Sequence, residues 1–310
     1  MNILFFGTSY IAQQFLFELY KNKHNIFVVT LPDKPYYKNV NLVKSYAESH
    51  NIPLLQPELF KQNIISQIIK YNVDIGVVID YGKLIPKKVF DLPHYKIFNI
   101  HFSLLPQYRG AAPIQYSLCN GDYETGVTSF YIDQTIDTGD IIIQKKLDIK
   151  YNDNAYTLLK KLIPLGIHVM NQTILELVTK NVINLPQHGI PSFTKRIKKS
   201  DGFINWHQSA ITIYNKFRGL YIWPGLYSII LKGKLTGKRI KFIDMEIYDY
   251  VSINSEHDHG TIESIKANKG FIVLCSIGKL LITKIQIEGK PIVSAWNFLQ
   301  GNQLQIGDKV

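Results

Sequence analysis

The chain has 310 residues, of which 46% are hydrophobic and 19% charged, so it can bury a sizeable core and is not largely disordered. A chain of this length more often divides into two domains than folds as one. The formal net charge of +11 is uneven, because residues 1–150 carry 15 Lys and Arg against 13 Asp and Glu, whereas residues 151–310 carry 20 against 11. The basic second half indicates a polyanionic partner such as nucleic acid or an anionic membrane face. A Lys-rich, low-GC genome is the alternative explanation, but it would not favour one half.

The first residues and the cysteines indicate a cytoplasmic protein with neither a disulfide framework nor a zinc ribbon. The first residues have no basic region and turn at Gly7, and no apolar run approaches the ~18 residues of a membrane span. Cys119 and Cys275 are far apart and are expected to be buried thiols, not a disulfide or a zinc ribbon. His257 and His259 share a polar loop with no further Cys or His at ligand spacing, so we expect a solvated turn there.

Short apolar runs alternate with amphipathic segments along the first part of the chain. We expect strands at residues 3–6, 26–30, 75–79, 97–100, 128–132 and 141–149, and helices at 11–20, 42–49 and 60–71. A helix is also expected over 157–178, in which Pro164 should cause a kink or start a second helix. This alternation predicts an α/β fold with a mostly parallel sheet covered on both faces. Gly7 lacks the second and third glycines of a dinucleotide fingerprint, so no NAD site is predicted.

The character of the sequence changes at about residue 185, where chain breakers replace periodic patterns. We expect a first domain over residues 1–184, a basic linker over 185–204 with a cluster at 195–199, and a second domain over 205–310. In the second domain, β-rich runs separated by turns predict a small barrel. These runs cover residues 227–232, 239–248, 260–265, 271–276 and 279–287.

An amide and an imidazole lie at the end of the apolar run at 97–100, and a carboxylate follows in a later turn. Asn99 and His101 are two residues apart on a predicted strand, so their side chains should project to the same side near its carboxyl end. Asp137 follows in an Asp-Thr-Gly-Asp turn, where Gly139 permits a tight backbone. An amine that attacks a carbonyl builds negative charge on oxygen, which an amide and an imidazole N–H can stabilise, while a carboxylate takes up amine protons. The trio therefore suits acyl transfer to an amine.

Each of the three residues also has a simpler explanation. Asn99 could be a strand-end cap, His101 a core histidine, and Asp137 part of an ordinary turn. Their combination around one predicted sheet edge, where ligand sites of open α/β sheets gather, favours the catalytic interpretation.

Several segments resemble the signature set of the methionyl-tRNA formyltransferase family, and together they cover nearly the whole chain. The segments are Asn99-x-His101-x-Ser103-Leu104-Leu105-Pro106, Arg109 to Gln115, Glu124 to Thr128, Asp137-Thr138-Gly139-Asp140, Tyr81 to Pro86 and Arg218 to Gly225.

The resemblance implies transfer of a formyl group from 10-formyltetrahydrofolate to the α-amine of methionyl initiator tRNA, for translation initiation, with no metal and no nicotinamide. It implies a Rossmann-like catalytic domain followed by an OB-like β-barrel that binds the tRNA, and we expect a monomer. Asn99 and His101 would polarise the formyl oxygen, and Asp137 would set the ionisation of His101 and help take up amine protons. The folate site would be lined by Ser103, Leu104, Leu105 and Pro106.

One loop departs from the family pattern. Residues 31–41 form a shorter and less basic loop than the family leads us to expect, with only Lys34 and Lys38 as cations. The loop would then contribute less to tRNA discrimination, and the basic cluster at 195–199 and the barrel lysines would contribute more.

Three other functions stay open at this point. An enzyme that formylates an amino-sugar nucleotide would share the folate chemistry but leave the basic half unexplained. A glycinamide ribonucleotide enzyme would resemble only the first domain. A nucleic-acid-binding protein that has lost catalysis is a third possibility, against which the intact Asn99, His101 and Asp137 speak.

Overall fold

The chain divides into two compact units in a computed structural model that describes residues 1–33, 40–181, 183–232, 234–301 and 304–310. The first unit contains residues 1–113, 124–148 and 159–194, and the second contains residues 114–123, 149–158 and 195–310. Lys34 and Lys38, the cations of the short loop, lie outside the described residues.

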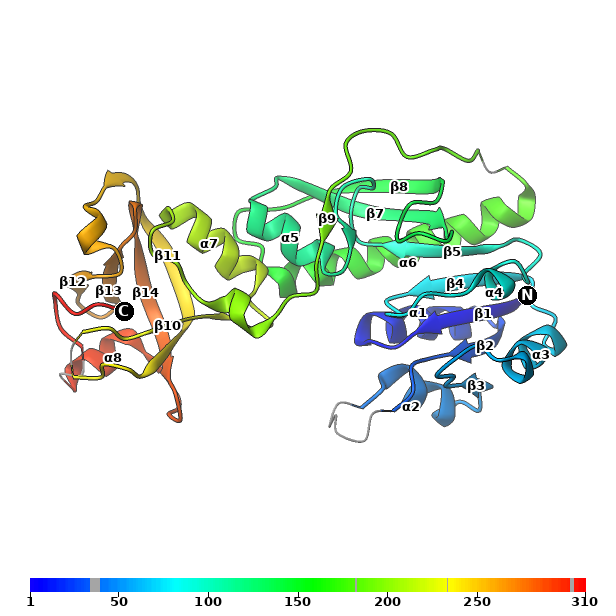
Figure 1. The fold of residues 1–310 in the computed structure, drawn as a ribbon, viewed down its shortest axis with the longest axis horizontal. Coiled ribbons are helices and arrows are strands. Elements are labelled where there is room, and N and C mark those ends of the chain that lie inside the picture. Colours follow the sequence, from blue (N-terminus) through cyan, green and yellow to red (C-terminus); the bar gives the residue numbers. More distant parts are fainter. Residues whose placement is uncertain (34–39, 182, 233, 302–303) are drawn as a thin grey trace. The chain divides into compact units, whose positions relative to one another are not determined.

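The first unit is built on a seven-stranded sheet in the order β3-β2-β1-β4-β5-β7-β8 (Figure 1). Its strands are β1 Asn2–Gly7, β2 Asn25–Val29, β3 Leu54–Leu55, β4 Ile75–Ile79, β5 Ile97–His101, β7 Glu124–Tyr131 and β8 Ile141–Asp148. The strands from β3 to β5 pair in parallel, and β7 and β8 join antiparallel. The predicted α/β fold with a mostly parallel, Rossmann-like sheet is confirmed. Two short strands, β6 Arg109–Gly110 and β9 Phe193–Thr194, form a separate parallel pair.

Helices cover this sheet because their apolar residues recur at helical spacing. They are α1 Tyr10–Lys21, α2 Leu42–Ser49, α3 Gln62–Lys70, the short α4 Lys87–Phe90, and α6 Ala155–Thr179. The Ser9 hydroxyl accepts a hydrogen bond from the Ala12 amide at 3.3 Å, which caps the start of α1. Leu4 and Phe6 of β1 share a buried cluster with Ile65 and Ile68 of α3. Alternate residues of β1 thus bury one sheet face under α3, as period-two side chains require.

Helix α6 differs from its prediction in two respects. It runs from Ala155 to Thr179 without interruption, so no second helix begins at Pro164. An internal proline loses one helix hydrogen bond, and burial of Leu162, Val169 and Met170 on either side offsets that cost. By length and composition α6 could also cross a membrane, which the sequence patterns did not indicate. This is weak evidence for a membrane segment, because the core helix of a globular protein has the same composition.

The second unit contains a six-stranded antiparallel sheet in the order β10-β11-β14-β13-β12, with β15 paired to β14. The strands are β10 Leu226–Ile229, β11 Arg239–Ile253, β12 Ile262–Lys266, β13 Gly270–Leu274, β14 Ile277–Ile287 and β15 Ile292–Ser294. The helices are α5 Pro113–Asn120, α7 Ala210–Gly219 and α8 Ala295–Gln300, with 3-10 turns at Lys199–Gly202 and Glu256–Asp258. A separate antiparallel β domain is confirmed, and its OB-like closure stays a prediction.

Arg218 and Gly219, part of one family-like segment, have structural roles within the second unit. The buried Arg218 guanidinium donates to the carbonyl oxygens of Tyr151 and Asp153, both at 3.2 Å. Burial lowers the pKa of Arg218. A Cβ on Gly219 would lie 2.4 Å from the sulfur of Cys119 in α5, so only glycine at this position lets α7 lie this close to α5. This motif therefore holds the segment 149–158 in place.

The expectation of a solvated turn is wrong for one of its histidines. His259 is buried, with Nδ1 3.0 Å from Nδ1 of His207. Among the described residues, no group of three or more His, Cys, Asp or Glu side chains is arranged to hold a metal ion. Both cysteines are free thiols; Cys275 is buried as expected, whereas Cys119 is only partly buried. Burial raises the pKa of Cys119 to about 11 and that of Cys275 to about 12.

Candidate active site

Strand β5 carries Asn99 and His101 at the point where the sheet changes from parallel to antiparallel pairing. Asn99 is paired with Phe130 of β7, and His101, the last residue of β5, is paired with Thr128. Because side chains alternate along a strand, Asn99 and His101 project to the same face of the sheet. The sequence predicted this arrangement.

The His101 ring is buried and has a polar partner near each of its two nitrogens. Its Nε2 lies 2.8 Å from the carbonyl oxygen of Tyr108, and its Nδ1 lies 3.7 Å from Oδ2 of Asp137. A carbonyl only accepts hydrogen bonds, so Nε2 carries the hydrogen in this arrangement. In a neutral ring the Nδ1 lone pair would then face the carboxylate. The 3.7 Å between Nδ1 and Oδ2 is too long for a direct hydrogen bond but within the range of an ion pair.

Asp137 reaches His101 only because its loop folds back along the sheet. Strand β7 passes His101 at Thr128 and ends at Tyr131, which is opposite Phe98 at the other end of β5. The loop after β7 must therefore return over about 10 Å, three strand residues, to bring the carboxylate to the imidazole. The amide of Gly110 donates to Oδ2 of Asp137 at 2.7 Å, which fixes the carboxylate in its place.

The backbone of this loop is strained at Asp137 and closely packed at Gly139. Asp137 has φ +56°, in the left-handed region that costs a non-glycine residue free energy. A Cβ on Gly139 would lie 1.7 Å from the carbonyl oxygen of Tyr131. The glycine thus permits the tight turn, as the sequence suggested, while the strain falls on the aspartate itself.

The Asn99 carboxamide has unused hydrogen-bonding capacity. Within the described part of the chain, its buried Oδ1 has no hydrogen-bond partner. A buried polar atom left unsatisfied costs about 1–3 kcal/mol, so such atoms at a sheet edge are good candidates for ligand contacts. The amide can accept from an N–H through its oxygen, or donate from its NH₂ after rotation.

The predicted folate-site segment is rigidly held, and its residues differ in accessibility. Ser103 and Leu105 are buried, and the Ser103 hydroxyl donates to the Gln107 carbonyl at 2.6 Å. The Thr128 hydroxyl donates to the Ser103 carbonyl at 2.7 Å. Leu104 and Pro106 are only partly buried, which leaves these two able to contact a ligand.

Sequence reasoning missed three residues that hold the site: Tyr108 and Gly110, described above, and Gln187. Tyr108 and Gly110 act through backbone groups, for which side-chain chemistry gives no signal. Gln187 was part of the expected linker, yet its amide donates to backbone carbonyls of the Asp137 loop. Residues 193–194 of the same segment form β9 against β6.

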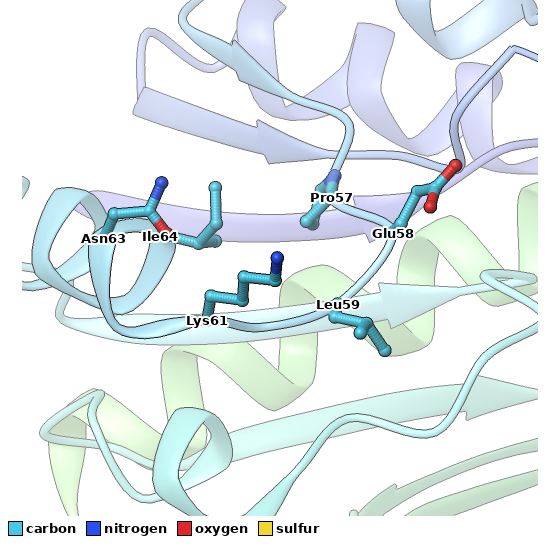
Figure 2. A pocket seen from close by; sticks show the side chains of 6 residues that line it. All are labelled: Pro57, Glu58, Leu59, Lys61, Asn63 and Ile64. Carbon is cyan, nitrogen blue, oxygen red and sulfur yellow. The ribbon is translucent and has the colours of Figure 1, made fainter.

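Two surface hollows lie among other residues of the first unit. One, of about 240 Å³, is lined by the loop before α3 and the start of that helix, and Figure 2 shows Lys61 extending between Ile64 and Pro57. The other, of about 290 Å³, is lined in part by Lys96, Tyr131 and the far side of the Asp137 loop. Neither is lined by Asn99, His101 or Asp137.

A Rossmann-like sheet that carries an amide and an imidazole on β5, with a carboxylate brought to them by the loop after β7, is the arrangement of a group-transfer enzyme. The chain belongs to the formyl transferase family: its residues 1–174 match the model "Formyl transferase" and residues 196–303 match "Formyl transferase, C-terminal domain".

Similar proteins extend along the full chain. The methionyl-tRNA formyltransferase of Endomicrobium trichonymphae is 53% identical over 313 residues, with 100% of both chains covered. That of Thermodesulfovibrio yellowstonii is 39% identical, with 98% of this chain and 97% of the relative covered. Solved structures share the fold. A sugar 3N-formyl transferase, WlaRD, has a TM-score of 0.67 at 23% identity, covering 94% of this chain and 99% of its own. Methionyl-tRNA formyltransferase from Clostridium thermocellum has a TM-score of 0.56 at 19% identity, and the match covers 80% of this chain and 93% of that structure.

Replacement of Gly139 by alanine should disrupt the Asp137 loop. The added methyl group would lie 1.7 Å from the Tyr131 carbonyl oxygen, so the loop must move away from the sheet. We expect the free energy of unfolding of the first unit to fall by about 1–3 kcal/mol in urea titrations. Ile136→Ala, at a 59% exposed position of the same loop, should change it by less than about 0.5 kcal/mol. Equal stabilities of the two variants would contradict the close packing at Gly139.

Proposed function

We propose that the chain transfers a formyl group from 10-formyltetrahydrofolate to the α-amino group of methionyl initiator tRNA, for translation initiation. One observation carries the proposal: the relative at 53% identity, matched along both complete chains, is a methionyl-tRNA formyltransferase. The arrangement of Asn99, His101 and Asp137 supplies the groups that this reaction needs.

The reaction replaces one carbon–nitrogen bond by another. The amine nitrogen of the methionyl group bonds to the formyl carbon, the bond from that carbon to N10 of the folate breaks, the amine loses a proton, and N10 gains one. Asn99 and an imidazole N–H of His101 stabilise the negative charge that develops on the formyl oxygen. Asp137 sets the ionisation of His101 and helps to take up the amine proton, directly or through water.

The folate is the formyl donor and a co-substrate, and the chemistry requires no metal. Solved relatives support a folate site in this fold, since WlaRD was determined with 5-N-formyl-THF. In this chain the site is assigned to Ser103, Leu104, Leu105 and Pro106. The partly exposed Leu104 and Pro106 make the contacts, while the buried Ser103 and Leu105 hold the segment in shape.

The tRNA is assigned to the linker and the second domain. Residues 1–184 form the catalytic domain, 185–204 the basic linker, and 205–310 an OB-like barrel that binds tRNA. Lys195, Arg196, Lys198 and Lys199 support this role, because all four are exposed cations on one short segment. The protein acts in the cytoplasm as a monomer, with no membrane partner.

An amino-sugar nucleotide is the alternative acceptor, because WlaRD is a sugar 3N-formyl transferase. At 23% identity that likeness shows the common fold and not a common substrate. The excess of cations after residue 150 favours the polyanionic acceptor.

Acceptor choice tests the function directly. The protein is incubated with 10-formyltetrahydrofolate and either methionyl initiator tRNA or a dTDP-linked amino sugar. We expect the formyl mass to appear on the methionyl group alone, as measured by mass spectrometry after deacylation. Formylation of the sugar nucleotide alone would establish the alternative, and formylation of neither would refute the proposed activity.

Asn99→Ala should reduce kcat by about 10²–10³, the effect of removing one oxyanion donor. Stopped-flow or quenched single turnovers with both substrates saturating would measure it. Asn63→Ala, at an exposed asparagine of α3, serves as the control and should retain wild-type turnover. Near-normal turnover of Asn99→Ala would remove Asn99 from its assigned role.

The binding of tRNA should weaken steeply with salt, because neutralised phosphates release counterions. In a triple variant, Lys195, Lys198 and Lys199 are each replaced by Gln. The plot of log affinity against log salt concentration should then be less steep, with its slope reduced by about 0.7–0.9 for each phosphate contact that is lost. A control variant in which Gln replaces Lys21, Lys23 and Lys70, three exposed lysines of the first unit, should keep the wild-type slope. Identical slopes in both variants would contradict the role of the basic cluster.

A further inference from the structure

Gln187 links the guanidinium of Arg109 to the loop that carries Asp137. Its Oε1 accepts from Nε and Nη2 of Arg109 at 3.1 and 2.7 Å. Its Nε2 donates to the carbonyl oxygens of Asp137 and Gly139 at 3.0 and 2.8 Å. All four hydrogen bonds are made by one carboxamide, which is therefore fully engaged on both sides.

The chemistry of the neighbours requires an amide at this position. A guanidinium only donates hydrogen bonds and a carbonyl only accepts them, so the bridging group must accept on one side and donate on the other. The carboxamide orientation is fixed by the same logic, with the oxygen toward Arg109. A glutamate of the same length would satisfy Arg109 but would direct an oxygen at two carbonyl oxygens.

The residues that present Gln187 are themselves anchored to the first unit. Leu185 and Ile141 exchange backbone hydrogen bonds of 3.0 and 2.8 Å just after the Asp137 loop. Beyond Gln187, the strand β9 pairs with β6, which contains Arg109. Gln187 is thus held at both flanks, so its amide is a rigid support and not a mobile surface group.

The supported loop needs such a partner. It returns along the sheet to His101, and Asp137 adopts φ +56°, a conformation that persists only where its surroundings enforce it. Gly110 fixes the Asp137 carboxylate, and Gln187 fixes the backbone carbonyl of the same residue. Together the two contacts determine where Oδ2 lies relative to the imidazole.

We propose that Gln187 is a positioning residue for catalysis, which, oriented by Arg109, holds Asp137 in the strained conformation that places its carboxylate beside His101. The proposal rests on the proposed formyl transfer. Gln187 acts through Asp137 and touches neither the formyl group nor the amine.

The test compares Gln187→Glu and Gln187→Ala with wild type and with Ile183→Ala, a control at a 75% exposed position four residues away and outside the tRNA-binding linker. Displacement of a catalytic group by about 1 Å costs up to 10² in rate, so we expect kcat to fall about 10- to 100-fold in both Gln187 variants. The KM values for folate and tRNA should stay within about twofold of wild type, since the Gln187 carboxamide is already occupied by Arg109 and the Asp137 loop. Wild-type turnover in Gln187→Glu would show that only the bulk of the side chain matters, and would overturn the proposal.

A double-mutant cycle separates positioning from general destabilisation. In an Asp137→Asn background, Gln187→Ala should lower kcat by less than about twofold, because its effect passes through the carboxylate that this background lacks. Multiplicative effects in the double variant would overturn the proposal.

Hydrogen exchange supplies a readout that needs no turnover. The Gly110 amide, which donates to Asp137, should lose protection in both Gln187 variants and keep it in Ile183→Ala. Unchanged Gly110 protection in the Gln187 variants would overturn the positioning role. If wild-type protein fails to formylate methionyl-tRNA, the proposed function fails, while this exchange measurement still decides whether Gln187 holds the loop.

Discussion

The site depends on the contact between the His101 imidazole and the Asp137 carboxylate, which the register of β5 and β7 makes difficult to form. Antiparallel pairing carries β7 away from His101, so the acid can reach the ring only through a loop that reverses along the sheet. In the proposed reaction an imidazole N–H polarises the formyl oxygen, and the carboxylate beside the ring is placed to take up the proton that the amine loses. The glycine of the loop, the left-handed aspartate and the Gln187 bridge all serve this one contact.

Much of the framework could be predicted because its signals are local. Apolar runs located β1, β2, β4 and β5, and alternation along a strand placed Asn99 and His101 on one face. The same local signals predicted α6, although they did not decide whether Pro164 would divide it, and they failed for His259, whose partner His207 is distant in sequence.

The support of the site could not be predicted, for a different reason. Tyr108 and Gly110 contribute backbone atoms, which every residue possesses, and Gln187 follows a stretch with no periodicity. Two-residue strands such as β6 and β9 are too short to produce a pattern. Contacts between residues nearly fifty positions apart become visible only when the chain is folded.

The environment of the cysteines has a practical consequence. Cys275 is buried and Cys119 partly buried, and the raised pKa of each thiol leaves little reactive thiolate at neutral pH, so maleimides and mild oxidants will react slowly with the native protein. A single cysteine engineered into an exposed turn would then be the dominant attachment point for a fluorophore or spin label, without prior removal of the natural ones.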